Sequence, residues 1–137
     1  MGLDMNLNGY KYLYEDFALP ETNRMEDGYR VVGVEVRLGY WRKHPDLHGY
    51  IVQEYMDGED KCQELPLNID KLRQIIAAVR AGKLPRTEGF FFGDSAGHWL
   101  DAEGVEATVA MLQGAITWLE ATVQGKEARS VIYQASW

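Results

Sequence analysis

The sequence predicts an α+β fold in which three helices pack on a mostly antiparallel sheet of about five strands. Stretches at the N-terminus, over residues 31–40 and at the C-terminus alternate apolar and polar side chains with a period of two. Three other stretches, between Pro45 and Gly125, carry apolar residues at helical spacing. Strands and helices neither alternate regularly nor separate into two halves, which indicates α+β. With 137 residues, we expect a single domain over residues 1–137.

The N-terminal segment predicts a β-hairpin. Residues 2–7 and 10–14 alternate, and the Asn8-Gly9 pair between them is a strong signal for a two-residue turn. Residues 10–14 include three tyrosines on one face, and cross-strand aromatic pairs would stabilise the hairpin. The polar residues 15–28 then predict a loop of variable conformation.

Residues 31–40 predict the strongest strand of the protein. Its apolar side chains fall on one face, at Val32, Val34, Val36, Leu38 and Tyr40. Pro45 is favoured in the first turn of a helix, so we expect a helix to begin there and to end at Asp57-Gly58.

The second half of the chain predicts two more helices and further short strands. Residues 64–67 are a short extended piece, Asn68 caps a helix that Gly82 ends, and Asp101 caps a longer helix that runs to Gly125. Residues 89–93 place three phenylalanines between glycines and predict a buried strand. Residues 131–137 alternate and predict a C-terminal strand.

The junction between the strand at 31–40 and the helix at Pro45 is one candidate binding site. It collects aromatic, basic and imidazole side chains, at Tyr40, Trp41, Arg42, Lys43, His44 and His48. Cationic groups at a helix N-terminus bind anions, and an aromatic ring can stack on a base. This pattern predicts a concave site for a small molecule or nucleotide. In the alternative interpretation, Tyr40 and Trp41 are core residues and Arg42 and Lys43 are solvated charges in a turn.

The acidic charge of the chain defines a second candidate surface. Of the net charge of −7, residues 87–125 contribute six acids and neither Lys nor Arg. This distribution argues against direct contact with a nucleic-acid backbone and favours a partner with a basic surface. Solubility alone is the other explanation of such a charge. The candidate partner-binding residues lie around the start of the third helix, at Asp94, His98, Asp101, Glu103 and Glu106.

No catalytic motif is present in the sequence. A P-loop, a dinucleotide fingerprint, a Gly-x-Ser-x-Gly elbow and a His-Glu-x-x-His helix are all missing. Nothing local brings Cys62 close to His48, and the spacing of His44 and His48 supplies only half of a metal site. We therefore predict no catalytic residue, no metal ligand and no cofactor. An enzyme of undefined reaction class remains an alternative.

Composition also predicts the compartment. No apolar run reaches the roughly 20 residues that span a bilayer, and the N-terminus lacks the basic segment of a signal peptide. One cysteine, Cys62, excludes an internal disulfide and is typical of a reducing environment. We expect a cytoplasmic protein without a membrane partner.

Short motifs are spread over most of the chain: MGLDM at the start, YWRK at 40–43 with His48 downstream, Cys62, GFFFG at 89–93 after Leu84-Pro85, and Ser136-Trp137 at the end. In this combination the chain resembles a family of small phage and prophage proteins that begin MGLDMYL and have no assigned function. It departs from them at Asn6, where they carry an aromatic residue. The resemblance implies the cytoplasm of a bacterial host and supplies no catalytic residues.

Together, the resemblance, the acidic charge and the missing catalytic motifs predict a phage accessory protein that acts without catalysis. Its expected role is that of an acidic inhibitor of a host defence complex with a basic surface, such as an anti-CRISPR protein. A small-molecule or nucleotide-binding protein that uses the Trp41–His48 junction is the alternative. An exposed aromatic patch at that junction would also favour a homodimer.

Overall fold

The computed structural model describes residues 2–88 and 98–137 of the chain. A four-stranded sheet has the order β4-β1-β6-β5, formed by Gly33–Arg42, Asp4–Leu13, Glu127–Ser136 and Leu65–Pro66. Every pair in this sheet is antiparallel. A small two-stranded sheet pairs β2, Met25–Glu26, with β3, Tyr29–Arg30. The predicted strand at 89–93 lies outside the described residues.

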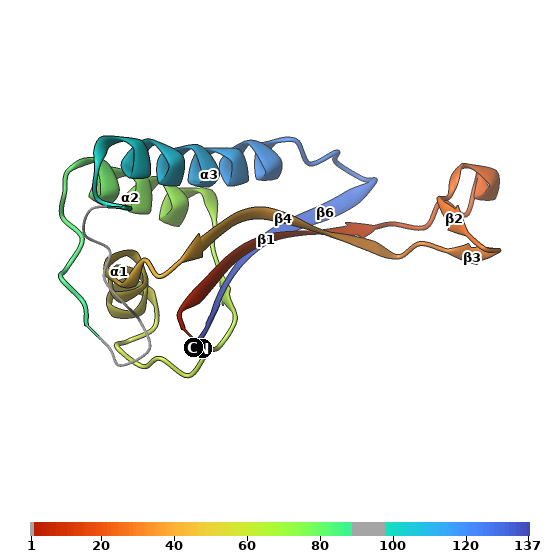
Figure 1. The fold of residues 1–137 in the computed structure, drawn as a ribbon. Coiled ribbons are helices and arrows are strands. Elements are labelled where there is room, and N and C mark those ends of the chain that lie inside the picture. Colours follow the sequence, from red (N-terminus) through yellow and green to blue (C-terminus); the bar gives the residue numbers. More distant parts are fainter. Residues whose placement is uncertain (1, 89–97) are drawn as a thin grey trace.

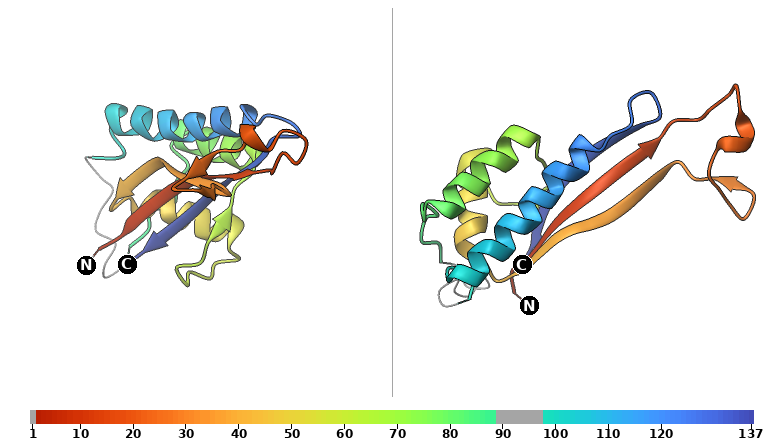
Figure 2. Two further views of the ribbon diagram at one scale, coloured as in Figure 1. Left: turned by 90° about the vertical axis from the view of Figure 1, so that its right-hand side faces the viewer. Right: turned by 90° about the horizontal axis from the view of Figure 1, so that it is seen from above.

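Three helices cover one part of this sheet: α1, Pro45–Tyr55; α2, Ile69–Arg80; and α3, Ala102–Glu120. In Figure 1 they gather at one end of the sheet, while β1 and β4 lead away from them into an arm that ends in β2 and β3. Figure 2 shows α3 lying along the sheet, and this helix contacts β4, β6 and β1. The α+β class is therefore confirmed, with four strands in the main sheet and a separate pair in the arm. None of the helices within the described ranges is long and apolar enough to cross a membrane.

The predicted N-terminal hairpin is wrong, because residues 4–13 form one continuous strand. Gly9 lies in the middle of β1 and pairs with Val36 of β4 on one side and Val131 of β6 on the other. A Cβ atom at Gly9 would lie only 2.7 Å from the ring of Trp118 on α3. Glycine is thus needed here for close helix–sheet packing and not for a turn.

The turn that does form a hairpin is Asp27-Gly28, in the segment expected to be a loop. It joins β2 to β3, and both residues have positive φ angles, 50° and 85°. Two left-handed residues in succession suit the twist of a two-residue hairpin turn. The same segment also contains a short 3₁₀ helix, η1, at Pro20–Thr22.

A β-bulge in β4 changes which side chains face the helices. Leu7 of β1 pairs with Gly39 and Asn8 pairs with Arg37, so Leu38 is an additional residue on β4. The expected single apolar face from Val32 to Tyr40 is therefore interrupted. Beyond the bulge, Gly39 and Trp41 are the buried residues and Tyr40 lies on the opposite face.

The predicted helix starts are confirmed, and α1 and α2 end close to the predicted residues, whereas α3 ends at Glu120, before the predicted end at Gly125. The helix α1 begins at Pro45, and the chain leaves it through Asp57 and Gly58, with φ angles of 53° and 75°. The side chains of Asn68 and Asp101 each accept a hydrogen bond of 2.8 Å from a backbone N–H in the first turn of α2 and α3. The core between sheet and helices is apolar and fully buried at Leu3, Met5, Leu7, Trp41, Leu47, Leu72, Ile75, Leu112 and Ile116.

Candidate functional site

The structure divides the residues of the predicted junction between the core and the surface. Trp41 is a core residue, 1% exposed, and its Nε1–H donates to Thr108 Oγ1 on α3 over 3.0 Å. Tyr40, on the other face, donates its hydroxyl proton to the Asp4 carboxylate, and this bond raises the pKa of the phenol. Arg42 is exposed and forms an ion pair with the same carboxylate over 3.3 Å.

Lys43 and His44 connect β4 to α1. Lys43 has a positive φ angle of 56°, and its N–H donates to the Leu3 carbonyl over 2.8 Å. His44 is the N-cap of α1, is only 1% exposed, and stacks parallel to Trp99 with 5.6 Å between ring centroids. Burial, followed by the charge of His98, lowers the pKa of His44 to about 3. The ring of His98 contacts Trp99 edge-on, with 4.7 Å between the two ring centroids.

Two hollows flank the junction. One, of about 260 Å³, is lined in part by His44 and Trp99. The other, of about 490 Å³, is lined in part by His48 and Trp137. Neither Arg nor Lys is among the described residues that line them. The described lining of both hollows therefore offers no Arg or Lys side chain to a ligand.

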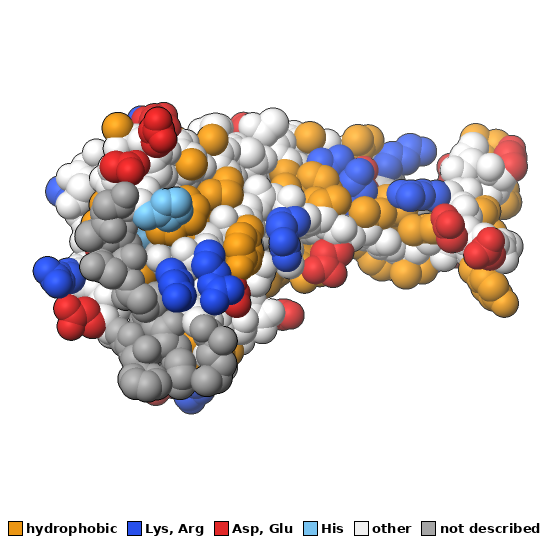
Figure 3. Space-filling view, viewed as in Figure 1, with side chains coloured by type: hydrophobic (Ala, Val, Ile, Leu, Met, Phe, Trp, Pro, Cys, Tyr) orange, Lys and Arg blue, Asp and Glu red, His pale blue; other side chains and the backbone are white. Residues whose placement is uncertain are grey.

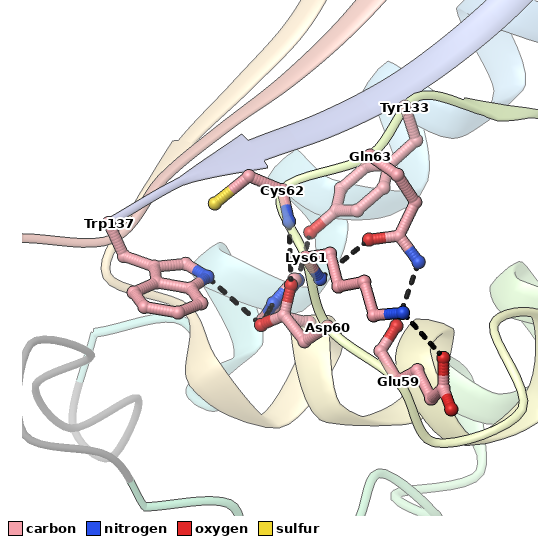
Figure 4. A network of polar contacts seen from close by, with 8 residues as sticks. Glu59, Asp60, Lys61, Cys62, Gln63, Tyr133 and Trp137 are labelled. Atoms are coloured by element: carbon pink, nitrogen blue, oxygen red, sulfur yellow. Dashed lines mark hydrogen bonds and ion pairs between the residues drawn. The ribbon is translucent and has the colours of Figure 1, made fainter.

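His48 belongs to a polar network, buried at His48 and Tyr133, that sequence patterns did not reveal. Its Nδ1 lies 2.6 Å from the Tyr133 hydroxyl and its Nε2 lies 2.7 Å from Asp60 Oδ2. Asp60 Oδ2 also accepts a hydrogen bond from Trp137 Nε1–H over 2.9 Å. The other carboxylate oxygen, Asp60 Oδ1, accepts one from the backbone N–H of Cys62 over 3.4 Å. Figure 4 shows Asp60 between Cys62 and Trp137, with Tyr133 nearby on β6. We call these residues, His48, Asp60, Cys62, Tyr133 and Trp137, the His48 network.

The His48 network holds together segments that are far apart in the sequence. Burial, and then the charge of Asp60, raises the pKa of Tyr133 well above its usual value, so its hydroxyl keeps its proton. It can therefore donate to His48 Nδ1 while His48 Nε2–H donates to Asp60. This arrangement joins α1, the segment before β5 and the end of β6. Because His48 and Tyr133 are buried and their polar atoms are engaged, the network favours one packing arrangement.

The acidic residues around α3 have structural roles. Asp101 caps the helix, and Glu106 forms an ion pair of 2.9 Å with Arg80 of α2. Glu103 lies in the first turn of α3, where a negative charge complements the helix dipole. Asp94 lies outside the described residues. The stretch without Lys or Arg in the sequence is therefore not free of positive charge in space, since α2 supplies Arg80.

In Figure 3, Lys and Arg side chains also form a band that leads from the helical end of the molecule toward the projecting segment with β2 and β3. Within residues 2–88 and 98–137, no group of three His, Cys, Asp or Glu side chains is arranged to hold a metal ion.

The arm, which we define as residues 14–32, carries an unusual concentration of exposed apolar side chains. Six of the ten large hydrophobic side chains that are exposed among the described residues lie on it: Tyr14, Phe17, Leu19, Met25, Tyr29 and Val32. Phe17 is 82% exposed and Tyr29 is 78% exposed. Tyr12, at the base of the arm, is exposed as well. A concentration of exposed apolar side chains on one segment is typical of interaction surfaces.

Polar contacts give the arm a defined conformation without a core of its own. Asp16 Oδ1 accepts from the N–H groups of Ala18 and Leu19 over 3.0 and 2.9 Å, and these bonds lower the pKa of its carboxyl. Asn23 Oδ1 accepts from the Asp16 N–H over 2.8 Å. Arg30 donates to the Leu13 carbonyl over 3.2 Å and so holds the arm to the end of β1. The exposed apolar groups are thus presented on an ordered backbone.

The signal in the sequence that pointed to the arm was the length of the loop predicted at residues 15–28, because loops of this length without structure of their own are often functional. No family model, curated protein or solved structure matches the chain.

Proposed function

We propose that this protein acts by binding another protein and that the arm is its binding element. The observation that carries this proposal is the exposure of six large apolar side chains on one projecting segment. Burying a side chain such as Phe17 in a partner would contribute roughly 1.5–3 kcal/mol. Because the backbone of the arm is already ordered by hydrogen bonds, little conformational entropy is lost on binding.

The charge of the arm supports a partner with a basic surface. Residues 14–32 contain five acids and two arginines. Glu15 is paired with Arg30 over 3.7 Å and Asp16 with Lys126 over 3.8 Å, while Glu21, Glu26 and Asp27 lie at exposed positions. An apolar recess rimmed by Lys or Arg would complement this surface. In the specific form that the sequence resemblance suggests, the partner is a host defence complex and binding inhibits it.

The test is capture of partners from a nuclease-treated bacterial lysate, followed by affinity measurement with the recovered protein. The double variant Phe17→Ser/Tyr29→Ser should weaken binding by roughly tenfold or more, because truncated aromatic anchors dominate interface energies. Val123→Ser is the matched control, since Val123 is 50% exposed and lies outside the arm. If the arm variant binds like the wild type, the proposal fails. If Glu103→Lys removes binding instead, the acidic start of α3 is the interface.

A further inference from the structure

The outer edge of β4 is covered at only one end. β4 is the first strand in the order β4-β1-β6-β5, so among residues 2–88 and 98–137 no strand pairs with its outer side. Near its C-terminal end, the Tyr40 N–H contacts Met111 Sδ of α3 at 3.3 Å, and the Arg42 carbonyl accepts from Trp99 Nε1–H over 2.8 Å. These contacts block the edge there. In Figure 1 this edge faces the viewer along its length.

The other end of the edge is open. Residues of an antiparallel strand point their backbone groups alternately to the two sides. Val32 points toward β1, because its carbonyl accepts from the Leu13 N–H over 2.9 Å. The alternation then turns the N–H and C=O groups of Gly33, Glu35 and Arg37 outward. In the part of the chain that the structure describes, no backbone bond outside the regular strand pairing engages these three residues.

The side chains on this open edge are charged in a self-complementary pattern. Glu35 accepts hydrogen bonds of 3.1 Å from both Asn8 and Tyr10, which fix its carboxylate. The guanidinium of Arg37 lies over the Tyr40 ring, 5.1 Å from its centroid. One anion and one cation are therefore held two residues apart on the same exposed edge.

We infer that β4 pairs with β4 of a second copy of this chain, antiparallel and about a two-fold axis at Val36. In this register Glu35 of one copy lies opposite Arg37 of the other, twice, and both residues exchange backbone hydrogen bonds. A shift of the axis to Glu35 would place the two Glu35 side chains opposite each other, and like charges in that position are destabilising. The bulge at Leu38 ends the ladder.

The resulting dimer has a continuous sheet made of the two four-stranded sheets. It removes the open edge, which is otherwise a template for uncontrolled pairing. Since the two copies of β4 run in opposite directions, the two arms point away from each other. The dimer would thus present two binding arms at once, and this increases avidity for a partner with repeated sites. The inference does not depend on the arm being the partner-binding element.

The test uses the full chain and analytical ultracentrifugation. The wild type should sediment at twice the chain mass of 15.6 kDa. Arg37→Glu places acids opposite each other and should raise the dimer dissociation constant roughly tenfold or more. The double variant Glu35→Arg/Arg37→Glu restores opposite charges and should restore the dimer. Arg80→Glu, which changes an exposed ion pair away from this edge, should leave the dimer intact.

A wild-type chain that remains monomeric overturns the inference, as does a dimer that Arg37→Glu leaves unchanged. Failure of the double variant to restore pairing overturns the proposed register. Hydrogen exchange provides a second measurement that needs no variant. The amides of Glu35 and Arg37 should exchange slowly at high protein concentration and quickly on dilution, and equal rates at both concentrations would contradict the pairing.

Discussion

The buried imidazole of His44 makes folding stability depend on pH in a direction that can be calculated. Its pKa falls from 6.5 to about 3 in the folded protein, first because of burial and then because of His98. Above pH 6.5 the ring is neutral in both states and contributes no slope. As the pH falls below that value, the unfolded chain takes up a proton that the folded chain excludes, so stability is lost. Between pH 7 and pH 5 the loss from this one group is about 2 kcal/mol.

Urea unfolding of the wild type and of His44→Asn at these two pH values tests the calculation. Asparagine retains an N-cap acceptor for α1 and removes the titrating ring. His48 and His98 are present in both proteins, so their contributions cancel in the difference. The stability advantage of the wild type over the variant should shrink by about 2 kcal/mol from pH 7 to pH 5. An advantage of constant size would refute the assignment of a strongly lowered pKa to His44.

Five substitutions at four positions test packing and hydrogen bonding through the free energy of unfolding in urea. Tyr133→Phe removes a buried hydroxyl from the His48 network and should cost about 1–3 kcal/mol; no loss would mean that the network does not hold these segments together. Gly49→Ala places a Cβ atom 2.0 Å from Thr87 Oγ1 and should cost roughly 1–3 kcal/mol. Gly114→Ala, in open space on α3, should instead stabilise by up to about 1 kcal/mol, and equal effects of the two changes would contradict the packing. Asp101→Ala removes the N-cap of α3 and should cost about 1 kcal/mol, whereas Asp101→Asn should be nearly neutral.

The starts of the helices were predictable because their signals are local. Pro45, Asn68 and Asp101 each act within one helical turn, through a fixed φ angle or a side-chain bond to a nearby N–H. The C-terminal strand was predictable for a similar reason, since its alternation is uninterrupted and its buried residues share one parity.

The N-terminal error shows how long-range pairing overrides a local signal. Asn8-Gly9 has the composition of a turn, but β1 is paired on both sides, by β4 and by the distant β6. These two ladders extend the strand through the pair, and the packing of Trp118 explains why one of its residues is glycine. Asp27-Gly28 has the same composition and does form a turn, because no second strand competes for its neighbours.

The His48 network was beyond prediction for a different reason. Tyr133 is 85 residues from His48, and only the pairing of β6 with β1 and the position of α1 bring them together. The ion pair between Arg80 and Glu106 likewise depends on the packing of α2 against α3. The charge count along the sequence therefore predicted an acidic surface on α3, but it could not predict that Arg80 of α2 lies next to it.

In the proposed function, the side chains that bind a partner are not the side chains that stabilise the fold. The core closes between the sheet and the three helices without any side chain from residues 14–32. Exposed side chains that touch no core change unfolding free energy by only about 0.5 kcal/mol when they are replaced. Phe17 and Tyr29 therefore contribute little to folding, whereas their transfer from water into a partner is favourable. Folding does not account for so much apolar surface on an ordered projection, and this is why we propose the arm as the binding element.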